Sequence, residues 1–526
     1  MSLPSYLPFA GPLLLAACAL ATKGPATAAN VRQRLARAEL ATFAGLGTAI
    51  AGAGLLASDG AGTSPLIGLV WNGFGLGLSA RLDALSAIIL TLVSFIGVII
   101  VRYSRNYLAG EPGQLRFTRW LLLTLAAVEM LVIAGNLVQL VAAWVLTSLA
   151  LHQLLLFYPE RRAAVTAATK KFWAARIGDV ALAGAALWLA RQFSTTDIAT
   201  LLDAAATTPA SLAVPAALLA LAAALKSGQF PSHGWLIEVM ETPTPVSALL
   251  HAGIVNAGGF LIIRFADVML AAPAVLSVLA IVGGFTALIG AIVMLIQPSI
   301  KVSLAWSTVS QMGFMLLQCG LGAFSVATLH IVAHSLYKAH AFLSSGSVVD
   351  RARAPANPSF GMPVRPLDAL AGLAIAGASV LAIGRLFGHS PASAPALLGL
   401  AAISVLGIAM LVTQSLGGTT RKAMLGRALG LGLAVTTVWF ATQSLASALL
   451  AGTLPPAPQP GALGLMVIVL AVASFALVAL AQLTAPLWLT RPSMQALRIH
   501  LANGLYANLI WNRLIGAYRK PANSAL

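Results

Sequence analysis

Long apolar runs separated by short polar connections dominate this chain. An apolar run of about 18–25 residues is long enough to cross the ~30 Å hydrocarbon core of a bilayer as a helix. The pattern predicts about fifteen membrane helices (13–15), with connections too short for a separate soluble domain. The predicted spans are 3–22, 38–57, 82–101, 118–134, 137–157, 173–190, 211–230, 244–268, 273–297, 302–321, 324–347, 366–388, 395–415, 428–450 and 461–487.

Composition supports an all-α polytopic membrane protein. The 526 residues are 59% hydrophobic and only 9% charged, whereas soluble domains carry about 25% charged residues. The two cysteines, Cys18 and Cys319, both lie in apolar runs and indicate neither a disulfide framework nor a metal site. The first apolar run has no basic residues before it, so it is interpreted as a first span rather than a cleaved signal.

The net charge of +17 is explained by topology, because cytoplasmic loops of membrane proteins are enriched in lysine and arginine. With the N-terminus outside and the spans alternating, 24 of the 31 basic residues fall inside and 4 fall outside. The outside residues are Arg81, Arg191, Arg264 and Arg385. The pattern predicts a multi-pass protein of a bacterial inner membrane, with a periplasmic N-terminus, a cytoplasmic C-terminus and no nucleic-acid partner.

The C-terminal tail, residues 491–526, has apolar residues at near-helical spacing interleaved with arginines. Such a pattern is typical of an amphipathic helix on the inner membrane surface. A docking face for a partner is an equally good interpretation of the same pattern.

The stretch "KSGQFPSHGWLIEVMETPTPVSALLHAG", residues 226–253, places ionisable groups between apolar runs. Gly228 and Pro231 predict a break in the helix just after Lys226, and broken spans are tolerated where they line a hydrated or protein-buried cavity. A lysine at such a break suits a proton relay, because burial disfavours its charged form. A lysine that snorkels from a helix end is the structural alternative. His251 lies within the next apolar run, and Glu238 and Glu241 are secondary candidates.

A second group of ionisable residues occurs in "LHIVAHSLYKAH". His330, His334 and Lys338 are spaced four residues apart and share one face of a helix. Such a row can pass protons, because neutral histidine both donates and accepts and titrates near neutral pH. The HxxxH spacing can also chelate zinc, but no cysteine or carboxylate completes that site.

Two further motifs carry charge into spans. Arg176 and Asp179, in "RIGD", are spaced for an ion pair that fixes helix orientation, takes part in proton transfer, or does both. Lys301 begins a run rich in small polar residues, "KVSLAWSTVSQMGFM", which suits close helix packing. The sequence contains no P-loop, dinucleotide fingerprint or nucleophile elbow, so ion movement is favoured over covalent catalysis.

These motifs together resemble the antiporter-type membrane subunits of respiratory complex I and of multi-subunit sodium/proton antiporters. The resemblance extends from about Asp83 ("RLDALSAI") to Asp350. It implies two inverted five-helix repeats, each with a broken helix. The implied divisions are 1–117 (first three helices), 118–268 and 273–415 (the repeats), 416–490 (C-terminal helices) and 491–526 (amphipathic tail).

The resemblance also implies roles for residues that match the family motifs. Lys226 resembles the broken-helix lysine, and His251 the histidine of "PTPVSALxHA". His330, His334 and Lys338 resemble the central relay, and Asp179 resembles the essential aspartate of "R-x-G-D". These six are the predicted proton-translocation residues, with Arg176 and Lys301 as secondary candidates.

Three features depart from the complex I pattern. Val145 stands in "AAWVLTS" where a "GWEG" glutamate is expected, and no lysine occurs between Lys338 and Lys422 for the second broken helix. The long lateral helix of the largest complex I subunit is missing. Glu129 and His152 are candidate substitutes for the lost glutamate, and Arg385 for the lost lysine; a buried hydrogen-bonded group or an interfacial charge is the structural alternative for each.

These departures resemble one branch, the membrane subunit of the bacterial dissolved-inorganic-carbon accumulation (DAB) complex. That resemblance implies a large cytoplasmic zinc-binding partner, of the DabA type and like a β-carbonic anhydrase. The resemblance implies that cation flow, of protons, drives hydration of CO2 to bicarbonate, with zinc in the partner and no cofactor in this chain. A pumping subunit of a complex I-like oxidoreductase, a sodium/proton antiporter and a non-conducting scaffold remain as alternatives.

Overall fold

The computed structural model describes residues 3–23, 28–71, 74–207, 211–347, 366–415, 421–484 and 491–514. Its contacts divide the chain into two compact units. The first unit comprises residues up to Val275, 330–345 and the segment from Ala507. The second comprises Leu276–Leu329 and Gly346–Tyr506. The division does not follow the predicted repeats 118–268 and 273–415, which remain a prediction.

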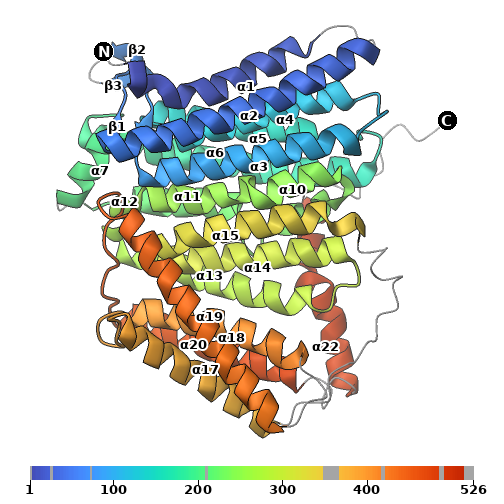
Figure 1. Cartoon of the computed structure of the whole chain (residues 1–526), viewed down its shortest axis with the longest axis vertical. Helices are drawn as coiled ribbons and strands as arrows, with labels where there is room; N and C mark the ends of the chain where they lie inside the picture. The colour runs from blue at the N-terminus through green and yellow to red at the C-terminus, as the bar shows by residue number, and fades with distance from the viewer. Residues whose placement is uncertain are drawn as a thin grey trace. The chain divides into compact units, whose positions relative to one another are not determined.

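The first unit is a set of long helices in which α2 packs along α3 and α5 along α6 (Figure 1). Its elements are η1 (Leu3–Phe9), α1 (Ala10–Ala21), α2 (Ala28–Asp59), β1 (Gly62–Thr63), β2 (Ile67–Trp71), β3 (Phe74–Leu78), β4 (Arg81–Leu82), α3 (Ala84–Tyr107), α4 (Gln114–Val132), α5 (Leu137–Leu155), α6 (Arg162–Phe193), α7 (Ile198–Thr207), α8 (Ala213–Lys226), α9 (Gly234–Glu238), η2 (Val239–Glu241), α10 (Thr244–Ala252), η3 (Ile254–Asn256), α11 (Ala257–Arg264), α12 (Ala266–Leu270) and α23 (Ala507–Leu514).

The second unit is also helical, and α15 (Phe324–Leu343) contributes residues to both units. Within the second unit α18 packs on α20 and α17 packs on α19. Its elements are α13 (Pro273–Met294), α14 (Ile300–Gly320), η4 (Ser345–Ser347), α17 (Pro366–Leu386), α18 (Pro395–Ser415), α19 (Arg421–Leu449), α20 (Ala462–Leu483), α22 (Pro492–Ala502) and η5 (Gly504–Tyr506). The first residues of α13 and of η4 are assigned to the first unit.

Every predicted span coincides with one helix or with consecutive helical segments separated by breaks. Eight helices in the described part of the chain are long and apolar enough to cross a membrane, and shorter apolar helices accompany them. The all-α, multi-helix prediction is therefore confirmed. The total of about fifteen crossings remains a prediction, since length and composition alone identify the eight.

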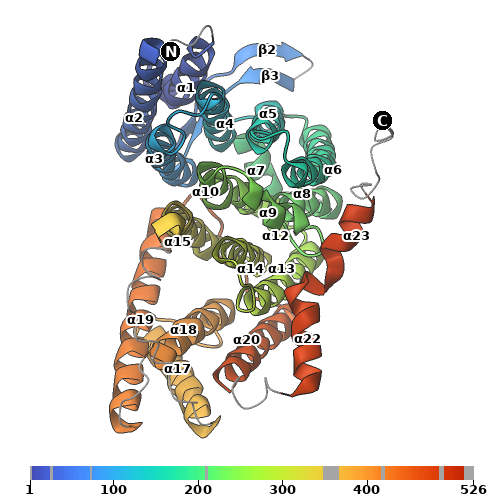
Figure 2. The same cartoon turned by 90° about the vertical axis from the view of Figure 1, so that its right-hand side faces the viewer.

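Two details of the sequence prediction were wrong. Helix α6 begins at Arg162 rather than at residue 173, so Lys170 and Lys171, assigned to a loop, lie buried on a helix. The charged first turns of α6 lowered the hydropathy and hid this extension. The connection before α3 also contains an antiparallel hairpin, β2–β3, which pairs Ile67 with Leu78 and lies to one side of the helices of this unit (Figure 2).

Charged residues assigned to the same side of the membrane contact one another in the first unit. On the predicted inner side, Arg105 Nη1 lies 2.9 Å from Glu39 Oε2. On the predicted outer side, Arg81 and Arg264 both contact Asp83. This grouping agrees with the predicted alternation of the helices, while the assignment of one side to the cytoplasm stays a prediction.

Small residues bring α13 and α14 of the second unit into close contact. A Cβ atom added to Gly283 would lie 2.5 Å from the backbone nitrogen of Leu317, and one added to Gly313 would lie 2.5 Å from that of Ala287. Ser310 Oγ donates a hydrogen bond to the carbonyl of Ala287 at 2.8 Å. The packing role expected for small polar residues in "KVSLAWSTVSQMGFM" is thus confirmed.

The described part of the tail forms α22 and α23, in agreement with the predicted helical pattern. In the first unit, Asn508 on α23 accepts a hydrogen bond from Lys170 Nζ at 2.7 Å and donates one to Glu238 Oε1 at 2.6 Å. Gly234 permits this approach, because a Cβ there would lie 2.0 Å from Asn508 Oδ1. One part of the tail therefore docks on its own chain, and residues 515–526 lie outside the described part.

Candidate functional site

The predicted helix break is present between α8 and α9. Helix α8 ends at Lys226, and Gly228 follows with φ +60°, a conformation that favours glycine. The chain becomes helical again at Gly234. The break leaves Lys226 at a helix end that is inside the protein, because its side chain is only 8% exposed. The structure thus excludes a lysine that snorkels to open solvent.

Lys226 is surrounded by an aromatic ring and by the Arg176–Asp179 pair. Its Nζ lies 4.4 Å from the centre of the Trp144 ring, a cation–π contact between α8 and α5. Arg176 and Asp179 form the predicted ion pair at 2.6 Å, and the charges of both act on Lys226. Within the described residues, Lys226 Nζ has no hydrogen-bond partner. The Trp144 ring and the charges of the Arg176–Asp179 pair, rather than a hydrogen bond, therefore surround this amine among the described residues.

Lys171 is a buried lysine of this group that the sequence prediction missed. Its side chain is 4% exposed, and its Nζ donates to Ser148 Oγ at 2.7 Å and to the Ser148 carbonyl. The charges of Lys226, Arg176 and Asp179 act on it. A sequence signal existed, since Lys171 and Asp179 are eight residues apart and share one face of a helix.

The two candidates for the lost glutamate occupy different surroundings. His152 on α5 lies beside Phe172, with 5.5 Å between the ring centres, and the charges of Lys171 and Arg176 act on it. Glu129 on α4 is 1% exposed and instead accepts a hydrogen bond from Ser94 Oγ of α3 at 2.9 Å. Geometry therefore connects His152 with the lysine group and connects Glu129 with α3.

A second interruption lies between α10 and α11, at Gly253. Asn256 bonds across it, donating from Nδ2 to the Ala252 carbonyl at 3.0 Å and to Ser335 Oγ of α15 at 2.8 Å. His251, at the end of α10, is fully buried and stacks on Phe342 with 4.5 Å between the ring centres. The interruption thus places His251 directly against α15.

The structure joins His251 to the predicted row on α15. His334 Nε2 donates a hydrogen bond to the His251 carbonyl at 3.0 Å, and the His330 and His334 rings are 6.0 Å apart. Lys338, which is fully buried, lies one turn further, and its charge acts on His251 and His334. Three buried ionisable side chains, His251, His334 and Lys338, and the half-buried His330 therefore form one group between α10 and α15. Their role in proton transfer remains a prediction.

The remaining candidates lie outside both groups. Glu238 is paired with Lys170 at 2.6 Å, Lys301 is half-buried near the start of α14, and Arg385 is exposed in the last turn of α17. The side chain of Glu241 lies outside the described residues. Because Arg385 is exposed, the structure does not support the hypothesis that it replaces the lysine of the second broken helix.

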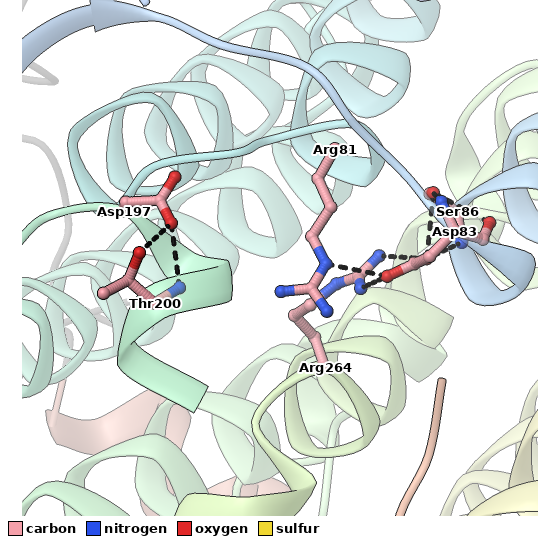
Figure 3. A network of polar contacts seen from close by, with 6 residues as sticks. All are labelled: Arg81, Asp83, Ser86, Asp197, Thr200 and Arg264. Carbon is pink, nitrogen blue, oxygen red and sulfur yellow. Dashed lines mark hydrogen bonds and ion pairs between the residues drawn. The ribbon is translucent and has the colours of Figure 1, made fainter. Parts of the chain in front are cut away.

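A third charged network, also missed, joins α3 to α11 (Figure 3). Asp83 caps α3 by accepting from the Ser86 backbone at 2.9 Å, and Ser86 Oγ accepts in return from the Asp83 backbone at 2.8 Å. The same carboxylate contacts Arg81 Nε at 2.8 Å and both terminal nitrogens of buried Arg264. Asp83 before an apolar run, with Ser86 three residues later, signals the cap. Nothing local in the sequence signals Arg264.

In the described part of the chain, no group of three or more His, Cys, Asp or Glu side chains is placed to hold a metal ion. The group around Lys226 contains cationic and neutral side chains with the carboxylate of Asp179, and the described side chains of the group on α10 and α15 are three histidines and Lys338. Their arrangement is suited to the exchange of protons rather than to the binding of a cation by oxygen ligands.

Comparison of the sequence with models of known protein families identifies the family of this chain. The family described as "NADH:quinone oxidoreductase/Mrp antiporter, TM" matches residues 134–426, more than half of the chain. The chain belongs to this family. A second family, described as "NADH-Ubiquinone oxidoreductase (complex I), chain 5 N-terminus", matches residues 69–118. The resemblance inferred from the motifs is confirmed.

Several curated members of this antiporter family are similar to the chain. The "Probable inorganic carbon transporter subunit DabB2" of Halothiobacillus neapolitanus is 38% identical over 513 residues, which are 95% of this chain and 91% of that protein. The "Probable inorganic carbon transporter subunit DabB" of Hydrogenovibrio crunogenus is 48% identical over 51% of this chain and 52% of its own. "NAD(P)H-quinone oxidoreductase chain 5" of Synechocystis sp. is 38% identical over 52% of this chain and 42% of its own.

Two solved structures share the fold. A chain of the Mrp complex from Dietzia sp. superposes with a TM-score of 0.57 and 23% identity, over 99% of this chain and 57% of that one. A chain of the membrane-bound sulfane sulfur reductase, an archaeal respiratory membrane complex, superposes with a TM-score of 0.56 and 16% identity, over 98% of this chain and 99% of that one. At these identities the likeness establishes an Mrp-like fold.

Proposed function

We propose that this chain is the cation-conducting membrane subunit of an inorganic carbon uptake complex, and that the cation is the proton. The observation that carries the proposal is similarity along the whole length of the relative named DabB2, which covers 95% of this chain and 91% of that protein. The two buried groups of ionisable residues around Lys226 and Lys338 supply suitable proton-binding sites.

The proposed partner is a large cytoplasmic subunit that binds zinc and resembles a β-carbonic anhydrase. In this arrangement the partner hydrates CO2 to bicarbonate, and this chain carries no catalytic zinc chemistry and acts as a transport subunit rather than an enzyme. One charge moving through 100 mV releases ~2.3 kcal/mol. Protonation changes near Lys226, His251 and Lys338 are proposed to bias an inner-surface contact with the partner.

A proton-pumping subunit of a complex I-like oxidoreductase is the second candidate. It is favoured by 38% identity to the Synechocystis chain 5 protein, which is confined to 52% of this chain. Val145, standing where the family glutamate is expected, counts against this candidate. A non-conducting scaffold is a third candidate, because the chain lacks the family glutamate at Val145 and the lysine of the second broken helix.

Gentle purification of the tagged chain from its native membrane separates these candidates. The preparation is analysed for co-purifying proteins and for zinc, and it is then reconstituted in vesicles for measurement of proton flux. We expect a large zinc-bearing soluble protein in fixed ratio and a measurable flux. Iron–sulfur subunits would favour the oxidoreductase, small antiporter subunits without zinc would favour the antiporter, and the zinc partner without flux would favour the scaffold.

A further inference from the structure

Lys170 and Lys171 are neighbours on α6 with different surroundings. Lys170 Nζ lies 2.6 Å from Glu238 Oε2 and 2.7 Å from Asn508 Oδ1, so a carboxylate balances its charge. Lys171 Nζ bonds only to the hydroxyl and the carbonyl of Ser148, both uncharged acceptors. Within the described residues, no carboxylate lies within ion-pair distance of Lys171. Its charge is therefore balanced by no direct partner.

Two cationic side chains and one carboxylate surround Lys171, so the group with Lys171 included holds three cations and one carboxylate. Lys226 comes from α8, and Arg176 and Asp179 come from α6, with Asp179 already paired to Arg176 at 2.6 Å. Helix α5 contributes Ser148, Trp144 and His152 to this region. Burial of an ion without a partner is strongly unfavourable, and two like charges in a protein interior repel strongly. One of the two lysines is therefore more stable without its proton.

We propose that Lys171 is a proton-carrying residue of this site and shares a single proton with Lys226. Binding of a second proton at either lysine expels one proton from the other, so protons entering and leaving balance. Although Lys171 belongs to α6, its amine thereby contacts α5 near the place expected for the missing glutamate, because Val145 lies three residues before Ser148 on α5. This inference deepens the proposed function and rests on it.

Arginine at position 171 tests whether the proton must leave. Arginine keeps a positive charge and can still donate to Ser148, but it does not lose its proton in proteins. In vesicles containing the whole purified complex, we expect Lys171→Arg and Lys171→Met to lower proton flux on the order of a hundredfold, a typical contribution of a positioned proton carrier. Lys170→Arg, at the neighbouring buried lysine, should keep its pair with Glu238 and conduct normally.

Histidine gives a second measurement, because its side chain is smaller than arginine and exchanges protons near neutral pH. We expect Lys171→His to conduct at least about tenfold faster than Lys171→Met. Complex yield and melting temperature are recorded for each variant. Normal flux in an assembled Lys171→Arg complex overturns the inference and leaves the proposed function intact. If that variant does not assemble, equal flux in the His and Met variants overturns it. A wild-type complex without flux overturns both proposals.

Discussion

The two units differ in what they bury. Among the described residues, the first unit buries charged side chains at many positions, including Glu129, Lys171, Asp179, Lys226 and Lys338. In the described part of the second unit, every buried polar side chain is uncharged: Thr286, Thr308, Gln318, Thr328, Ser379, Thr436 and Gln443. Ionisable residues inside a membrane protein are costly and mark ion pathways. The residues of the proposed proton route with buried charges therefore belong to the first unit.

The second unit has polar groups of another kind. A cavity of about 710 Å³ in this unit has a mostly apolar lining that includes the hydroxyl and amide groups of Ser325, Gln443 and Ser447, together with His389. Ser325 Oγ accepts from Gln443 Nε2 at 2.9 Å. The lysine expected in a second broken helix is not matched by any buried cation among the described residues of this unit. Among the described residues, the buried polar contacts of the first unit thus include charged side chains, and those of the second unit are made by uncharged ones.

The largest effect is expected at the two buried lysines on which the comparison depends. Lys226→Met and Lys338→Met each remove a proton-binding amine and should lower proton flux and inorganic carbon uptake on the order of a hundredfold or more. Both variants should still assemble, because methionine fills a similar volume. Flux in vesicles and uptake by cells measure the loss. Normal uptake in both variants would refute a route through the first unit.

The next effect concerns stability and the network of Asp83. Arg264→Met leaves a buried carboxylate with only Arg81, and Asp83→Asn leaves Arg264 without a counter-charge, so each should destabilise the protein by about 3–5 kcal/mol. Thermal unfolding of the purified complex measures the change. The double variant Asp83→Leu/Arg264→Met should be more stable than Arg264→Met alone. A double variant that loses as much as the two single losses added together would contradict a buried pair.

In the second unit, we expect the stability of variants to depend on helix packing rather than on buried charge. Gly283→Ala places a Cβ 2.5 Å from the Leu317 backbone and should cost about 1–3 kcal/mol of stability through overpacking. Gly284→Ala is the matched control, because its Cβ would lie 3.8 Å from Leu317 Cδ1, an ordinary contact. Melting temperatures of the two variants test the difference. Equal melting temperatures would show that α13 and α14 do not pack as closely as described.

The smallest effect is expected at Arg385, the sequence candidate for the missing lysine. Its side chain is exposed at the end of α17, and surface substitutions usually change stability by less than about 0.5 kcal/mol. Arg385→Gln should therefore leave flux and melting temperature near wild type. A large loss of flux with normal assembly would assign the second unit a charged step and remove the contrast between the units.

Local sequence patterns predicted much of the fold and part of the candidate site. Hydropathy located the helices, Gly228 and Pro231 located the break after Lys226, and four-residue spacing placed His330, His334 and Lys338 on one face. Each of these signals depends on residues close together in the chain, where helix geometry fixes the relation between side chains. The family motifs then singled out His251 and Asp179, which the structure places in the two buried groups.

Contacts between distant segments were decided only by the tertiary structure. Arg264 meets Asp83 across 181 positions, and Lys170 meets Asn508 across 338. The burial of Lys171 follows from the packing of α6 on α5, although its charge had suggested a loop. Such pairings depend on how helices are placed against one another, and hydropathy carries no information about that placement. The sequence by itself determined which segments are helices and where one breaks; packing decided which charges are buried and what they contact.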